Sequence, residues 1–268
     1  MSICNEMFEG WDLGRICQYC AGMGYSGIEI APFTLGEKPL EVSTARRKEI
    51  RETISGHGMS CVGLHWLLAK TTGFHLTTND GAIRKQTAQY LSDLVELCRD
   101  LGGSVMVFGS PQQRSRLPDV SPDQAWTNAL EVFRNTIPVL EKHNVTLVLE
   151  PLGPEETNFL NTAEEVVRMI EKIGSENIRL LLDVKAMSTE SITIPEIIGR
   201  NHQHLVHFHA NDPNRLGPGM GDMDFRPIMQ ALRDCKYDGW VSVEVFDFRP
   251  GPELIASRSI ECLKKSLA

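Results

Sequence analysis

Four side chains able to bind a metal ion stand where four successive predicted strands end. About 30 residues, the length of one strand–helix unit, separate each from the next. They are Glu150, Asp183, His209 and Glu244. Three carboxylates and one imidazole form a mostly oxygen donor set, which suits Mn²⁺, Mg²⁺ or Co²⁺ and accepts Zn²⁺ less selectively. We therefore expect one divalent metal ion per chain, with Mn²⁺ as the first candidate.

A metal ion in such a site acts as a Lewis acid on a carbonyl group and its neighbouring hydroxyl. It lowers the cost of the enediolate that forms when a proton leaves the carbon beside the carbonyl. Two glutamates on opposite sides of the substrate can remove this proton and return one. The outcome is epimerisation, aldose–ketose isomerisation, or elimination if a β-leaving group departs.

An alternative explanation is that these acidic residues cap the helices that follow, or pair with nearby bases. It accounts well for any single residue of this kind. It accounts less well for four of them, spaced one unit apart on consecutive strands.

Short β-rich runs alternate along the chain with longer stretches of helical periodicity. The predicted strands are 3–6, 27–31, 60–66, 104–109, 145–150, 178–183, 204–210 and 241–246. The predicted helices are 13–23, 43–57, 80–101, 121–143, 162–173, 194–200, 225–235 and 252–267. Eight such units in about 250 residues predict a (β/α)8 TIM barrel, an α/β fold, and we expect one domain over residues 1–268. In a barrel the carboxyl ends of the strands meet at one rim, so the four side chains should share one cup.

The charge and composition of the chain exclude several classes of protein. Its 268 residues carry 27 Lys and Arg against 35 Asp and Glu, a net charge of −8, so we expect no nucleic-acid partner. No apolar run approaches the roughly 20 residues of a membrane helix, and no basic segment followed by an apolar one opens the chain. The seven scattered cysteines indicate reduced thiols. We expect a cytoplasmic protein without a membrane partner.

Four stretches of the chain resemble a known group of enzymes. They are EPL at 150–152 with ETNFLN at 156–161, LLLD at 180–183, HFHANDPNR at 207–215 with GPGMG at 217–221, and VEVF at 243–246. The chain resembles the xylose isomerase-like barrels, specifically the sugar isomerase/epimerase group that includes the ketose 3-epimerases. The resemblance covers nearly the whole length. It implies a small sugar as substrate and a homo-oligomer, either a dimer or a tetramer.

The resemblance also implies roles for individual residues. The group binds one divalent metal ion at the positions that match Glu150, Asp183, His209 and Glu244. Of these, Glu150 and Glu244 would also be the acid/base pair. The positions that match Glu156 and Arg215 contact the sugar.

One position departs from the pattern of this group. The epimerases usually carry a histidine three residues after the aspartate ligand, where this chain has Ala186. The metal site survives the change, whereas the usual free ketose substrate is put in question. Lys185 lies beside this position, and it either serves a different substrate oxygen or faces solvent.

Further residues stand near the predicted strand ends. His65 and Trp66 end the third strand, where an imidazole and an aromatic face suit a sugar ring, although both could equally be packing residues. Glu29 should face into the barrel towards a polar partner. His207 shares a strand face with His209 and is either a support for the site or part of a barrel layer.

Two more positions bear on the space and charge around the site. Gly109, at the end of the fourth strand, would leave room for a ligand. Arg114 is one of the cations that could meet a substrate phosphate, although it belongs to no dedicated motif.

We expect a metal-dependent isomerase that epimerises or isomerises a ketose or a related polyhydroxy-ketone through an enediolate. One alternative is a lyase that eliminates from a 3-oxo sugar or keto-polyol at the same site. Another is a sugar-binding barrel without catalysis, which would require an intact fold with a degraded cup.

Overall fold

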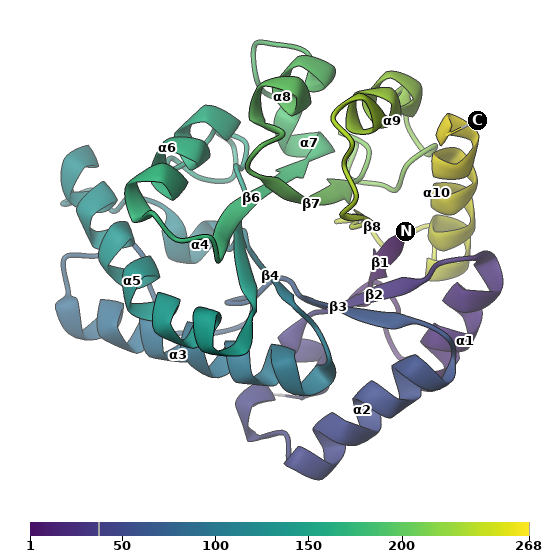
Figure 1. The fold of residues 1–268 in the computed structure, drawn as a ribbon, viewed down its shortest axis with the longest axis horizontal. Coiled ribbons are helices and arrows are strands. Elements are labelled where there is room, and N and C mark those ends of the chain that lie inside the picture. Colours follow the sequence, from purple (N-terminus) through teal and green to yellow (C-terminus); the bar gives the residue numbers. More distant parts are fainter. Residues whose placement is uncertain (37, 268) are drawn as a thin grey trace.

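The computed structural model describes residues 1–36 and 38–267 as a closed barrel of parallel strands. The strands follow one another around the barrel in sequence order, and the last pairs with the first. They are β1 (Ser2–Cys4), β2 (Gly27–Ile30), β3 (Ser60–Leu64), β4 (Val105–Phe108), β5 (Thr146–Leu149), β6 (Ile178–Asp183), β7 (Leu205–Ala210) and β8 (Trp240–Val243). Figure 1 shows the strands at the centre with helices around them. The predicted TIM barrel is confirmed.

Helices cover the outside of the barrel. The longer ones are α1 (Leu13–Met23), α2 (Thr44–Gly56), α3 (Gly81–Leu101), α5 (Pro122–His143), α6 (Ala163–Ile173), α8 (Ile194–Asn201), α9 (Phe225–Asp234) and α10 (Pro252–Leu267). Side-chain caps start several of them, as at Ser43 and Ser121, whose hydroxyls accept from backbone N–H groups three residues on. No helix among the described residues has the length and apolar character needed to cross a bilayer.

The structure differs from the sequence expectations mainly at the carboxyl ends of the strands. β5 ends at Leu149 and β8 at Val243, so Glu150 and Glu244 are the first residues beyond their strands. Four short helices were not expected: η1 (Pro32–Leu35), η2 (Pro39–Glu41), α4 (Pro111–Arg114) and α7 (Val184–Met187). Three of them begin at proline, which fixes φ and favours the first helical position. They lie in the βα loops, which build the functional face of a TIM barrel.

The interior of the barrel is divided between apolar and polar side chains. On one side, Val107, Val148 and Leu181 form a small buried cluster of their own. Elsewhere Glu29 and His207 are almost completely buried, and His207 Nε2 donates to Glu29 Oε1 at 2.7 Å. Buried polar side chains are tolerated where they are hydrogen-bonded. The hydrogen bond to His207 therefore allows the Glu29 carboxylate to lie inside the barrel, beneath the rim.

Arg114 does not reach the cavity, contrary to the expectation that it could meet a phosphate. Its side chain is 1% exposed. The guanidinium donates to the backbone carbonyls of Gly109, Glu150, Phe159 and Leu160, at distances from 2.6 to 3.2 Å. These bonds join the loops that follow β4 and β5, so Arg114 supports the segment that carries Glu150.

We predict that Arg114→Met lowers the free energy of unfolding by about 3 kcal/mol, because several buried carbonyls lose their donors. Urea denaturation measures this change. Arg134→Met is the matched control, since Arg134 is exposed and its guanidinium donates to the backbone carbonyl of Lys172. An Arg114 variant as stable as the control would contradict the supporting role.

Candidate metal and active site

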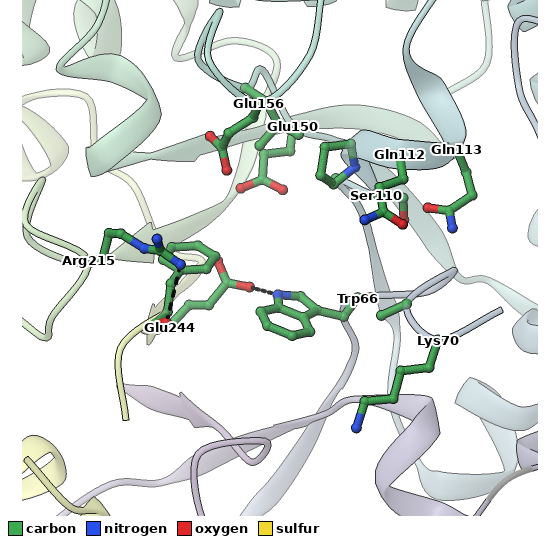
Figure 2. Close-up of a pocket in the computed structure, with 14 residues that line it drawn as sticks. Trp66, Lys70, Ser110, Gln112, Gln113, Glu150, Glu156, Arg215 and Glu244 are labelled. Atoms are coloured by element: carbon green, nitrogen blue, oxygen red, sulfur yellow. Dashed lines mark hydrogen bonds between the residues drawn. The ribbon is translucent and has the colours of Figure 1, made fainter. Parts of the chain in front are cut away.

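The four predicted metal-binding residues come together at the rim formed by β5 to β8. They are Glu150, Asp183, His209 and Glu244, and one ligand atom from each lies within 4.8 Å of the others. None is more than 5% exposed. Figure 2 shows Glu150 and Glu244 reaching one cavity from different parts of the barrel. Closure of the barrel thus brings these four residues, far apart in sequence, close together in space.

The electrostatics of this cluster suit a divalent cation. Burial, followed by repulsion from Glu244 and Asp183, raises the pKa of Glu150 well above its usual value. Burial and the charge of Glu244 likewise raise the pKa of Asp183 to about 6. A cation among these oxygens would favour the ionised carboxylates and offset their repulsion. The donor set therefore fits a metal ion of the hard, oxygen-preferring kind.

Hydrogen bonds to each other and to residues outside the cluster hold His209 and Glu244 in place. Trp66 Nε1 donates to Glu244 Oε1 at 2.7 Å, and His209 Nδ1 lies 3.0 Å from Glu244 Oε2. The other ring nitrogen, His209 Nε2, lies 3.3 Å from Glu29 Oε2. Burial opposes the imidazolium, yet Glu244 and Glu29 raise the pKa of His209 well above its usual value. A carboxylate on Nε2 orients the ring so that Nδ1 faces the cluster.

Asp183 caps a helix, one of the two alternatives that the sequence left open, and it also stands in the candidate metal-binding cluster. Its Oδ1 accepts from the backbone N–H of Ala186 at 2.8 Å and so caps α7. Its Oδ2 accepts from the Asn211 amide at 2.5 Å. Asn211 also accepts from the backbone N–H of Lys185, so it ties the loops after β6 and β7 together. The sequence analysis did not identify Asn211 as a residue of the site. Its position two residues after His209 is the feature of the sequence that could have indicated it.

A cavity of about 440 Å³ opens directly over this cluster. Its wall includes Glu150 and Glu244 as well as three of the expected sugar contacts, Trp66, Glu156 and Arg215. Figure 2 shows these side chains on opposite sides of the space. Two members of the cluster, Glu150 and Glu244, therefore line a cavity open to a small molecule, and Asp183 and His209 lie behind them.

The family of the chain follows from comparison with known proteins. The model of the xylose isomerase-like TIM barrel family matches residues 17–266. The chain belongs to this family. The resemblance to ketose 3-epimerases is borne out by curated relatives.

This xylose isomerase-like barrel has sugar epimerases among its relatives. It is 28% identical to D-psicose 3-epimerase of Ruminiclostridium cellulolyticum over 232 residues, which are 84% of this chain and 75% of that protein. It is 24% identical to 3-dehydro-D-guloside 4-epimerase of Escherichia coli K12 over 247 residues, 90% of this chain and 89% of that protein. A D-psicose 3-epimerase crystallised in the presence of D-fructose shares the fold, with a TM-score of 0.86 at 22% identity, covering 99% and 98% of the two chains.

Two of the expected sugar contacts lie outside the cavity wall of this xylose isomerase-like barrel. His65 is completely buried, and its Nε2 donates to Glu6 Oε2 at 2.5 Å. Lys185 does not face solvent: it is 8% exposed, and its ammonium donates to Glu156 Oε2 at 2.5 Å. Trp66, unlike its neighbour His65, lines the cavity. Its backbone has a positive φ of 52°, which turns the chain just beyond the end of the strand.

Small side chains at the end of β4 make room for Glu150 as well as for a ligand. A Cβ atom at Gly109 would lie 2.3 Å from Glu150 Oε2, so any side chain there would displace the carboxylate. The short helix α4 follows and brings Gln112 and Gln113 to the cavity wall. No sequence pattern had pointed to these two amides, which can exchange hydrogen bonds with hydroxyl groups.

We predict that Glu29→Gln weakens Mn²⁺ binding about 10–100-fold, because the ring of His209 loses its carboxylate partner. Metal titration of chelator-treated protein measures this affinity. Glu6→Gln is the matched control, since Glu6 is also a buried glutamate paired with a histidine, and that histidine, His65, is not one of the four cluster residues. Equal affinities for the two variants would remove Glu29 from the support of the metal site.

Proposed function

We propose that this chain is a divalent-metal-dependent sugar epimerase or isomerase that acts on a ketose or related polyhydroxy-ketone through an enediolate. The observation that carries the proposal is the convergence of Glu150 and Glu244 on one cavity, beside Asp183 and His209. The sugar epimerases among its relatives support the same class of substrate.

The four clustered residues would hold the metal ion, with Mn²⁺ the first ion to test. When bound, the ion supplies Lewis-acid polarisation of a carbonyl and its neighbouring hydroxyl. In the proposal, Glu150 and Glu244 are the acid/base pair: one carboxylate takes the proton from the carbon beside the carbonyl, and the other returns a proton. Which of them acts first depends on the face of the sugar that each one meets.

The cavity wall provides the groups that a polyhydroxylated substrate requires. Arg215 offers hydrogen-bond donors, and the Glu156 carboxylate offers acceptors. Trp66 and Phe246 stack with ring centroids 6.2 Å apart and planes inclined by 16°, and both line the cavity. Their apolar surface suits the C–H face of a sugar. In the proposal these residues orient the sugar over the two glutamates.

Metal content and turnover together test the proposal. Protein purified and reconstituted with Mn²⁺ should bind about one ion per chain and lose activity with chelator. In D₂O, an epimerase should place deuterium on the carbon that loses its proton, and an isomerase should place it on the neighbouring carbon, in both cases with no change in the carbon skeleton. Absence of metal binding after reconstitution, or binding of keto-sugars without any exchange, would contradict catalysis of this kind.

Elimination from an oxo-sugar is the second candidate function, and it is supported by the contact between Lys185 and Glu156. The Lys185 ammonium donates a hydrogen bond to the Glu156 carboxylate, so a free ketose would meet an ion pair at this part of the cavity wall. One relative, 3-dehydro-D-guloside 4-epimerase, is named for an oxo-sugar carried in a glycoside. Product analysis separates the two functions, because elimination yields an unsaturated product and a released group.

A further inference from the structure

A second cavity, of about 370 Å³, adjoins the cavity over the metal-binding cluster. Three residues line both spaces and so form the wall between them: Glu156, Arg215 and Phe246. The second cavity continues over the loops that follow β6 and β7, away from Trp66. A ligand bound over Glu150 and Glu244 could therefore extend past Arg215 into this space.

The second cavity is lined by both donors and acceptors of hydrogen bonds. Lys185 and Arg215 provide N–H donors. The Ser188 hydroxyl donates to the Lys185 carbonyl at 2.6 Å and the Thr189 hydroxyl to the Ala186 carbonyl at 2.8 Å. Because these hydroxyl hydrogens are already used, both oxygens are left as acceptors for a ligand.

The charges of the lining cancel. The Lys185 ammonium is paired with Glu156, and Glu155 brings a second carboxylate to the same space as Arg215. A phosphate or carboxylate entering here would meet two negative side chains as well as two positive ones. A neutral group with many hydroxyls would instead find a partner for each donor and each acceptor.

We propose that the second cavity binds a glycosyl residue, so that the preferred substrate is a keto-sugar carrying a further sugar rather than a free monosaccharide. This inference rests on the proposed function, since it assigns the reacting keto-sugar to the cavity over Glu150 and Glu244. Each cavity alone is at the small end of the range of about 300–1,000 Å³ for small-molecule sites. The two together offer room for a disaccharide.

Binding to the Mn²⁺-loaded protein tests the inference independently of turnover. Isothermal titration would compare D-fructose with four disaccharides in which glucose is joined to O1, O4, O5 or O6 of fructose. We expect at least one disaccharide to bind about tenfold more tightly than D-fructose, equivalent to about 1.4 kcal/mol. Ser188→Trp fills the second cavity and should reduce this advantage to less than about twofold, whereas Ser191→Trp, an exposed position of the same loop outside the lining, should preserve it.

Three results would overturn the glycosyl site. They are equal binding of D-fructose and all four disaccharides, an advantage that survives Ser188→Trp, and tighter binding of fructose 6-phosphate than of every disaccharide. Thr189→Trp repeats the test should the first variant fail to fold. Deuterium exchange measured on the same sugars separates the two proposals: exchange on D-fructose without a disaccharide preference rejects only the glycosyl site, and a disaccharide preference without exchange rejects only the catalytic function.

Discussion

Glu150→Gln should lower kcat for proton exchange by about 10²–10⁴-fold, the usual contribution of a positioned general acid or base. The amide keeps the size of the side chain and one oxygen that can bind a cation, but it cannot take up or release the proton. Burial and neighbouring carboxylates already raise the pKa of Glu150, which shows how strongly its surroundings act on its protonation. Deuterium incorporation from D₂O into the keto-sugar measures the effect.

The control for this substitution is Glu171→Gln, which makes the same change on an exposed glutamate of α6. Metal content and thermal midpoint are measured on both variants, so that a lost ion is not mistaken for a lost base. Turnover by a metal-loaded, folded Glu150→Gln protein at the rate of the control would falsify the acid/base assignment.

Removal of the metal ion should destabilise the protein more at pH 7.5 than at pH 5. In the metal-free protein the pKa of Asp183 is raised to about 6, above its ordinary value of 3.8. Between pH 3.8 and about pH 6 the unfolded chain has released the proton that folded Asp183 still holds, so stability falls as pH rises through this range. The whole shift of about two pKa units corresponds to about 3 kcal/mol, of which about 1.4 kcal/mol is lost between pH 5 and pH 7.5, and the raised pKa of Glu150 acts in the same direction.

Thermal unfolding with Mn²⁺ and with chelator, at both pH values, measures this difference. A bound cation offsets the repulsion among the carboxylates, so the gain in midpoint on adding metal should grow with pH. Asp183→Asn should reduce both the gain and its pH dependence, because one of the raised carboxyls is gone. Asp119→Asn, at an exposed position, serves as the control. A metal-induced gain that is independent of pH in the wild-type protein would count against the carboxylate cluster as the binding site.

The barrel and the clustering of the four candidate metal ligands could be predicted from the sequence because their signals are local. Hydrophobic periodicity marked most helices to within one or two residues, and α1 and α10 have the predicted bounds. Capping residues such as Ser43 and Ser121 act on N–H groups three residues away. Parallel strands of a barrel must end at one rim, so residues one unit apart at strand ends were bound to meet.

The partners of these residues could not be predicted, because barrel closure alone brings them together. Trp66 and Glu244, like Glu29 and His207, are 178 residues apart in sequence yet hydrogen-bonded. No periodicity relates such positions. Their contact depends on strand register and on the direction in which each loop turns.

The fate of the charged residues near the rim was also decided by tertiary structure. Arg114 and Lys185 both looked like free cations in the sequence. The first is enclosed by backbone carbonyls of the loops after β4 and β5, and the second is paired with Glu156. A buried charge requires a partner, and the loops supply that partner only once the strands have closed the barrel. The sequence alone thus determined the fold and the convergence of the four candidate ligands, whereas tertiary packing determined which side chains orient them and which face the cavity.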